Sequence, residues 1–120
     1  MAFDGLWRSE GHIPQFVAYT QASAADDEAG KAAALEALTA YAAEVGTTLN
    51  SVNENLPADA VTEAITMHAT TLIAVIDAAA AGGDPAEVAR LAREAVHHMS
   101  GTADVLAEAT VKLMPEKFAG

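Results

Sequence analysis

Residues 35–57 read LEALTAYAAEVGTTLNSVNENLP, and this stretch decides the fold of the chain. Its apolar residues recur at alternating spacings of three and four, which places them along one stripe of an α-helix. They are Leu35, Leu38, Ala42, Val45, Leu49 and Val52. We expect a helix over 29–53, because Asp26 and Asp27 stand just before it, where carboxylates cap free N–H groups.

The same period continues on the C-terminal side of this stretch. Pro57 opens a second helix, expected over 58–81, and residues 84–113 form another, with the short AGGDP turn at 81–85 between them. The stripe of the first is Val61, Ile65, His68, Leu72, Val75 and Ala79. That of the second is Val88, Leu91, Ala95, His98, Thr102, Val105, Ala109 and Leu113. A turn this short makes the two helices antiparallel neighbours.

On the N-terminal side the pattern predicts one more helix, over 4–25. Gly11 and Pro14 both weaken it, so it starts either near Asp4 or near Pro14. Its apolar face is Ile13, Phe16, Val17 and Thr20. Four amphipathic helices with short loops predict an all-α, up-down-up-down antiparallel four-helix bundle, with residues 1–120 forming a single domain.

The charge balance limits the partners of the chain. Six Lys and Arg residues stand against seventeen Asp and Glu residues, a formal net charge of −11. Such a field repels phosphate backbones and anionic lipids and attracts cations, metal ions included. No apolar run approaches the roughly 18 residues that span a bilayer. We expect no nucleic-acid partner and no membrane insertion, while homo-oligomerisation stays open.

Motifs typical of enzymes are missing from the sequence. There is no cysteine, no glycine-rich phosphate loop, no nucleophile elbow and no His-Glu-x-x-His. A carboxylate-bridged di-iron site needs two Glu-x-x-His motifs, and the chain has one, from Glu94 to His97. We therefore expect a binding protein that is not an enzyme.

Three histidines fall on or beside the predicted core stripes. His12 lies at the start of the first helix, and His68 and His98 belong to the stripes of the last two helices. Rise per residue places His68 and His98 within about one turn of each other. A buried imidazole needs a hydrogen bond or a metal. The pattern predicts a copper or zinc site with ligands His12, His68 and His98 and with Met99 as a soft fourth.

Two alternatives remain open at this point. The histidines can bond to neighbouring polar side chains such as Thr71 or Asp104, which makes the chain a protein-interaction or spacer module. Small residues follow His68 and His98, and the space beside them suits water, an ion, or a haem with axial histidines. His97, about 100° around the helix from His98, is expected to lie beside the site.

The chain resembles a family of small helical domains in bacterial proteins, many of them exported. The resemblance rests on Leu6-Trp7-Arg8 before His12, Tyr41 with Gly46, His68 followed by IDAAAAGGD, and the ending HHMSGTADVLAEATVKLMPEKF with Pro115 and Phe118. It implies a four-helix fold, histidine positions matching His12, His68 and His98, and an extracytoplasmic location. It implies no chemistry.

Overall fold

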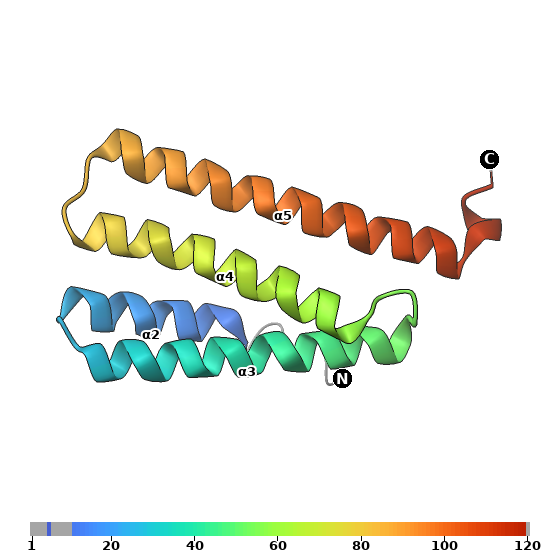
Figure 1. Cartoon of the computed structure of the whole chain (residues 1–120), viewed down its shortest axis with the longest axis horizontal. Coiled ribbons are helices and arrows are strands. Elements are labelled where there is room, and N and C mark those ends of the chain that lie inside the picture. The colour runs from blue at the N-terminus through green and yellow to red at the C-terminus, as the bar shows by residue number, and fades with distance from the viewer. Residues whose placement is uncertain (1–4, 6–10, 120) are drawn as a thin grey trace.

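Four helices follow one another in antiparallel order in the computed structural model, which describes residue 5 and residues 11–119 (Figure 1). They are α2 (His12–Ala24), α3 (Glu28–Val52), α4 (Ala58–Ala80) and α5 (Pro85–Leu113), followed by the short 3-10 helix η1 (Pro115–Lys117). Helix α2 packs on α3, α3 on α4 and α4 on α5. This arrangement confirms the all-α fold and the up-down bundle.

The bounds expected for the last three helices are confirmed to within one residue, because local signals fix their ends. The Asp27 side chain accepts a hydrogen bond from the Gly30 amide at 3.0 Å and caps α3. After α4 the chain turns at Gly82, whose φ of +66° suits glycine, and the Gly83 amide donates to the Ala78 carbonyl at 2.9 Å. Such caps satisfy backbone groups that a helix end leaves free.

The first helix begins two residues before Pro14, the later of its two expected starts. Helix α2 begins at His12 with Gly11 as its N-cap residue. Pro14 is its third residue, where a missing N–H costs no intrahelical bond. A start at Asp4 falls outside the described residues. The predicted apolar face is wrong, because Tyr19 and Ala22 are buried while Ile13 and Val17 are 58% and 51% exposed.

The core lies between α3 and α4 and reaches the end of α5. Its members are Tyr41, Val45, Leu56, Val61 and Ala109. Helix α4 is central, since its backbone approaches α2, α3 and α5, whereas α5 approaches only α4 and η1 among the described elements. The molecule is therefore elongated, 52 × 30 × 20 Å, with α4 between α2 and α5 (Figure 1), and α2 and α5 do not pack on each other in the described part of the chain.

Helix α4 differs from the expectation that no apolar segment approaches the length needed to span a bilayer. Residues Ala58–Ala80 are long and apolar enough, by length and composition alone, to cross a membrane. The sequence contains no uninterrupted apolar run of that length because Thr and His residues divide it, yet these residues carry little charge. Val61 is the buried residue of this helix, and none of its most apolar 18-residue window is buried in the described structure.

Candidate functional site

The helix lengths bring four chemically distinctive side chains to one level of the bundle. The common reference is the end at which α2 and α4 finish and α3 and α5 start (Figure 1). His12 and His68 each lie twelve residues before the ends of α2 and α4. Tyr41 and Met99 lie thirteen and fourteen residues after the starts of α3 and α5. At about 1.5 Å per residue, all four lie roughly 20 Å from that end.

The place of His12 depends on the length of the first helix. A start near Pro14 in a helix as long as its neighbours would leave His12 at one end of the bundle, away from the site. The helix begins close to that point, at His12 itself, but α2 has 13 residues against 25 in α3. Its first residue therefore lies beside the middle of α3, at the level of His68.

A cavity of about 160 Å³ opens where these side chains meet. All four helices contribute to its lining. The lining residues are His12 and Phe16 of α2, Leu38 and Tyr41 of α3, Ile65, His68 and Ala69 of α4, and Met99 of α5. Two imidazoles, a phenol and a thioether are thus the functional groups of an otherwise apolar cavity.

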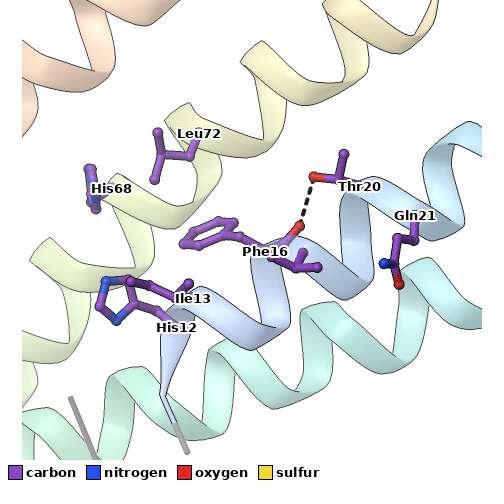
Figure 2. A pocket seen from close by; sticks show the side chains of 8 residues that line it. His12, Ile13, Phe16, Thr20, Gln21, His68 and Leu72 are labelled. Atoms are coloured by element: carbon purple, nitrogen blue, oxygen red, sulfur yellow. Dashed lines mark hydrogen bonds between the residues drawn. The ribbon is translucent and has the colours of Figure 1, made fainter. Parts of the chain in front are cut away.

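A wider and more open hollow of about 470 Å³ lies on the other side of the histidines. Figure 2 shows its lining, with His12 and His68 together at one end and Phe16 and Leu72 beside them. It shares His12, Phe16 and His68 with the cavity. The exposed Ile13 and Val17 belong to this hollow, so the apolar face predicted for α2 faces the open side of the bundle.

His68 is the best defined of the candidate ligands. Its Nδ1 is buried and has no hydrogen-bond partner in the described part of the chain, while the ring interacts with the backbone of Ala95 in α5. Burial lowers the pKa of His68, and positive charge on His12 and on His98 lowers it further. Burial also lowers the pKa of His12. Both shifts favour the neutral imidazole, which is the form that binds metals.

Tyr41 is a site residue that sequence reasoning did not select. Its ring lies 5.3 Å from the His12 ring, centroid to centroid and tilted by 32°, and its hydroxyl is buried without a partner among the described residues. Burial raises the pKa of this phenol. The signal was present, because Tyr41 follows Leu38 by three residues and precedes Val45 by four, which is the spacing of the buried stripe.

His98 does not line the cavity, and Met99 takes its place there. The predicted stripe of α5 joined Ala95 to His98 and Val105, whereas the observed one joins it to Met99 and Leu106; Val105 is 55% exposed. Both stripes share Thr102 and Ala109, so spacing alone did not decide. Met99 and Leu106 give the more apolar face and are partly buried, whereas His98 and Val105 are exposed. His98 is exposed and lines a separate groove between α4 and α5.

The predicted set of three histidines and one methionine is thus divided. His12, His68 and Met99 line one cavity, and His98 faces another groove. Among residues 5 and 11–119, no group of three or more His, Cys, Asp or Glu side chains is placed to hold a metal ion. His97 is exposed and lines neither space.

Comparison of the chain with protein-family models, with curated proteins and with solved structures gives no match. The resemblance to a bacterial helical family, and the export that it implies, therefore stay predictions.

Proposed function

We propose that this chain is a non-enzymatic metal-binding bundle in which His12, His68 and Met99 hold a copper(I) ion. The observation that carries the proposal is the state of His68. A metal-binding histidine almost always gives its other ring N–H to a backbone carbonyl or a carboxylate, which fixes the tautomer. The His68 ring interacts with the Ala95 backbone, and its buried Nδ1 has no partner among the described residues.

The donor set favours copper(I) over zinc. Thioether sulfur selects Cu(I), and imidazole suits copper as well. Structural zinc sites almost always have four ligands, whereas the cavity offers two imidazoles and one thioether. Its volume of about 160 Å³ suits an ion and is below the roughly 300–1,000 Å³ of pockets for small organic molecules. The same comparison disfavours haem, since no Lys or Arg among the described residues lines either space to pair with propionates.

The competing function is a protein-interaction or spacer module whose histidines serve the core. The contact between His68 and Ala95 favours this alternative too, because it satisfies one ring nitrogen without any ligand. The two functions differ in what Met99 does. In a spacer module Met99 only fills space, and Leu at that position fills nearly the same volume.

An anaerobic titration of copper(I) against a chromophoric chelator tests the proposal. We expect the unaltered protein to bind one tight equivalent, Met99→Leu and His68→Gln to lower that affinity at least about tenfold, and the matched controls Met114→Leu and His97→Gln to leave it unchanged. Met114 and His97 are lining residues of neither space.

Thermal unfolding gives a second readout of the same site. Ligand at about 100 times its dissociation constant adds roughly 2.7 kcal/mol of stability, which for a domain of this size raises the midpoint on the order of 10 °C. Equal stabilisation of the unaltered protein and the His68→Gln variant, or none with copper(I), would support the spacer module.

A further inference from the structure

Helices α4 and α5 carry the same pair of residues in opposite order. Helix α4 has Met67 followed by His68, and α5 has His98 followed by Met99. The helices are antiparallel neighbours, and consecutive residues of a helix point about 100° apart. Each side of the α4–α5 pair therefore receives one histidine and one methionine, contributed by different helices.

One of these sides is the cavity with His68 and Met99. The other is a groove of about 310 Å³ lined by Met67 and His98. Its remaining lining residues are Ala60, Glu63 and Ala64 of α4 and Gly101, Thr102 and Val105 of α5. Glu63 precedes Met67 by four residues and so lies one turn away on the same helix face.

Core packing does not account for the side chains in this groove. Met67 is 43% exposed and His98 is also exposed, so neither fills the interior. The small residues Ala60, Ala64 and Gly101 leave room between the helices, and a Cβ on Gly101 would meet nothing within 4 Å. Imidazole, thioether and carboxylate thus share an open groove on a strongly acidic chain.

We infer that Glu63, Met67 and His98 form a second metal-binding site, open to solvent, on the opposite side of α4 and α5 from the cavity. The choice of a soft ion rests on the proposed function, but the two sites share no ligand. Thioether and imidazole select copper(I) here as they do in the cavity, and the Glu63 carboxylate adds a negative charge that attracts cations.

Exposure sets the affinity of this second site relative to the first. Water competes for an ion in the open groove, so the groove binds more weakly and exchanges faster than the cavity. Charge also couples the two, since positive charge on His98 is felt at His68. We therefore expect the cavity to fill first and the groove to fill with a second equivalent.

Silver(I), which is soft and does not change oxidation state, tests the inference in the full chain with ¹³C-labelled methionine methyl groups. The methyl signals are assigned with Met→Leu variants and followed by NMR. We expect the Met99 signal to shift over the first equivalent and the Met67 signal over the second, while the Met114 signal stays in place. His98→Gln should abolish the Met67 shift and leave that of Met99, and Glu63→Gln should weaken the second equivalent several-fold.

The outcomes separate this inference from the proposed function. A shift of Met99 alone would overturn the groove site and leave the cavity site standing. A shift of Met67 alone, lost in His98→Gln, would support the groove site and contradict copper(I) binding in the cavity. A Met67 shift that survives in His98→Gln would overturn the groove site, because an exposed thioether would then be binding silver by itself.

Discussion

Tyr19 and Tyr41 are both buried tyrosines, and their hydroxyl groups have opposite surroundings. The Tyr19 hydroxyl donates to both carboxylate oxygens of Asp77, at 3.1 and 3.2 Å, and so joins α2 to α4. The Tyr41 hydroxyl has no partner in the described chain. A buried polar group without a partner costs stability, whereas one hydrogen bond to a charged group contributes about 1.5–3 kcal/mol.

Replacing each tyrosine with phenylalanine should therefore have opposite effects at neutral pH. We expect Tyr19→Phe to lower the free energy of unfolding by about 1.5 kcal/mol, the low end for such bonds, because water can reach Asp77. Tyr41→Phe removes an unsatisfied hydroxyl and should be neutral or stabilising. Urea unfolding measures both, and a loss of more than about 1 kcal/mol in Tyr41→Phe would mean that its hydroxyl has a partner.

The same phenols predict how stability changes in alkali. Burial raises the pKa of both tyrosines, and the hydrogen bond to Asp77 adds to the rise at Tyr19. The folded protein then holds these protons more tightly than the unfolded chain. The stability they contribute is present below pH 10 and is lost as the pH rises through 10 toward the raised pKa values. Unfolding between pH 9 and 11 should show a smaller decline in the Tyr19→Phe/Tyr41→Phe double variant.

At the scale of helices, α3 and α4 approach each other closely at Gly46. A Cβ at this position would overlap the backbone oxygen of Ala58 and the hydroxyl of Thr62. That hydroxyl already donates to the Ala58 oxygen at 2.7 Å, so the oxygen has little freedom to move. Gly46 thus sets how near the two helices come and how tightly the core between them packs.

Alanine substitutions at Gly46 and Gly101 should distinguish the contribution of this close contact to stability from that of helix propensity. Gly46→Ala should destabilise by about 1–3 kcal/mol, because overpacking outweighs the gain in propensity. Gly101→Ala adds a methyl group in open space and should stabilise by about 0.5–1 kcal/mol. Denaturation midpoints with equal slopes measure both changes, and a stabilised Gly46→Ala variant would contradict the close approach.

The helices themselves could be predicted from the sequence more completely than their rotations. Period, caps and glycine-proline signals fixed α3, α4 and α5 to within one residue. The rotation of α5 depends on whether His98 or Met99 turns inward. Spacing does not decide between the two side chains, whereas the relative cost of burying each of them does. For α2, the apolar face of Ile13 and Val17 is present in the sequence, but whether a fourth helix covers it depends on packing between distant segments.

The candidate site shows the same limit. His68 and Met99 were predicted as ligands and line the cavity, and His12 joins them because α2 is short. Tyr41 was missed as a lining residue. His98 was predicted to face the cavity, whereas it lines the groove on the other side of α5. Its neighbour in that groove is Met67, which directly precedes His68 in α4. Sequence spacing brings residues to one level, and only packing decides which of two adjacent residues turns inward.

The whole molecule is less compact than a typical globular domain of the same length. Its radius of gyration is 16.3 Å, against about 14 Å for a compact domain of 120 residues. Among the described elements α5 packs on α4 and η1 but not on α2 or α3, and the wider hollow between α2 and α4 is left open. The exposed apolar side chains of that hollow are consequently accessible to solvent.

The attachment of α5 through one neighbour has a consequence for amide hydrogen exchange. Cooperative units with few contacts open at a lower free energy than the whole protein. We expect α5 amides to exchange through such a sub-global opening, and those of α3, which carries more buried side chains than any other described helix, only through global unfolding. Because α5 carries Met99, copper(I) in the cavity should slow α5 exchange more than α3 exchange. The copper(I) ion would then leave the cavity at the rate at which α5 detaches from α4.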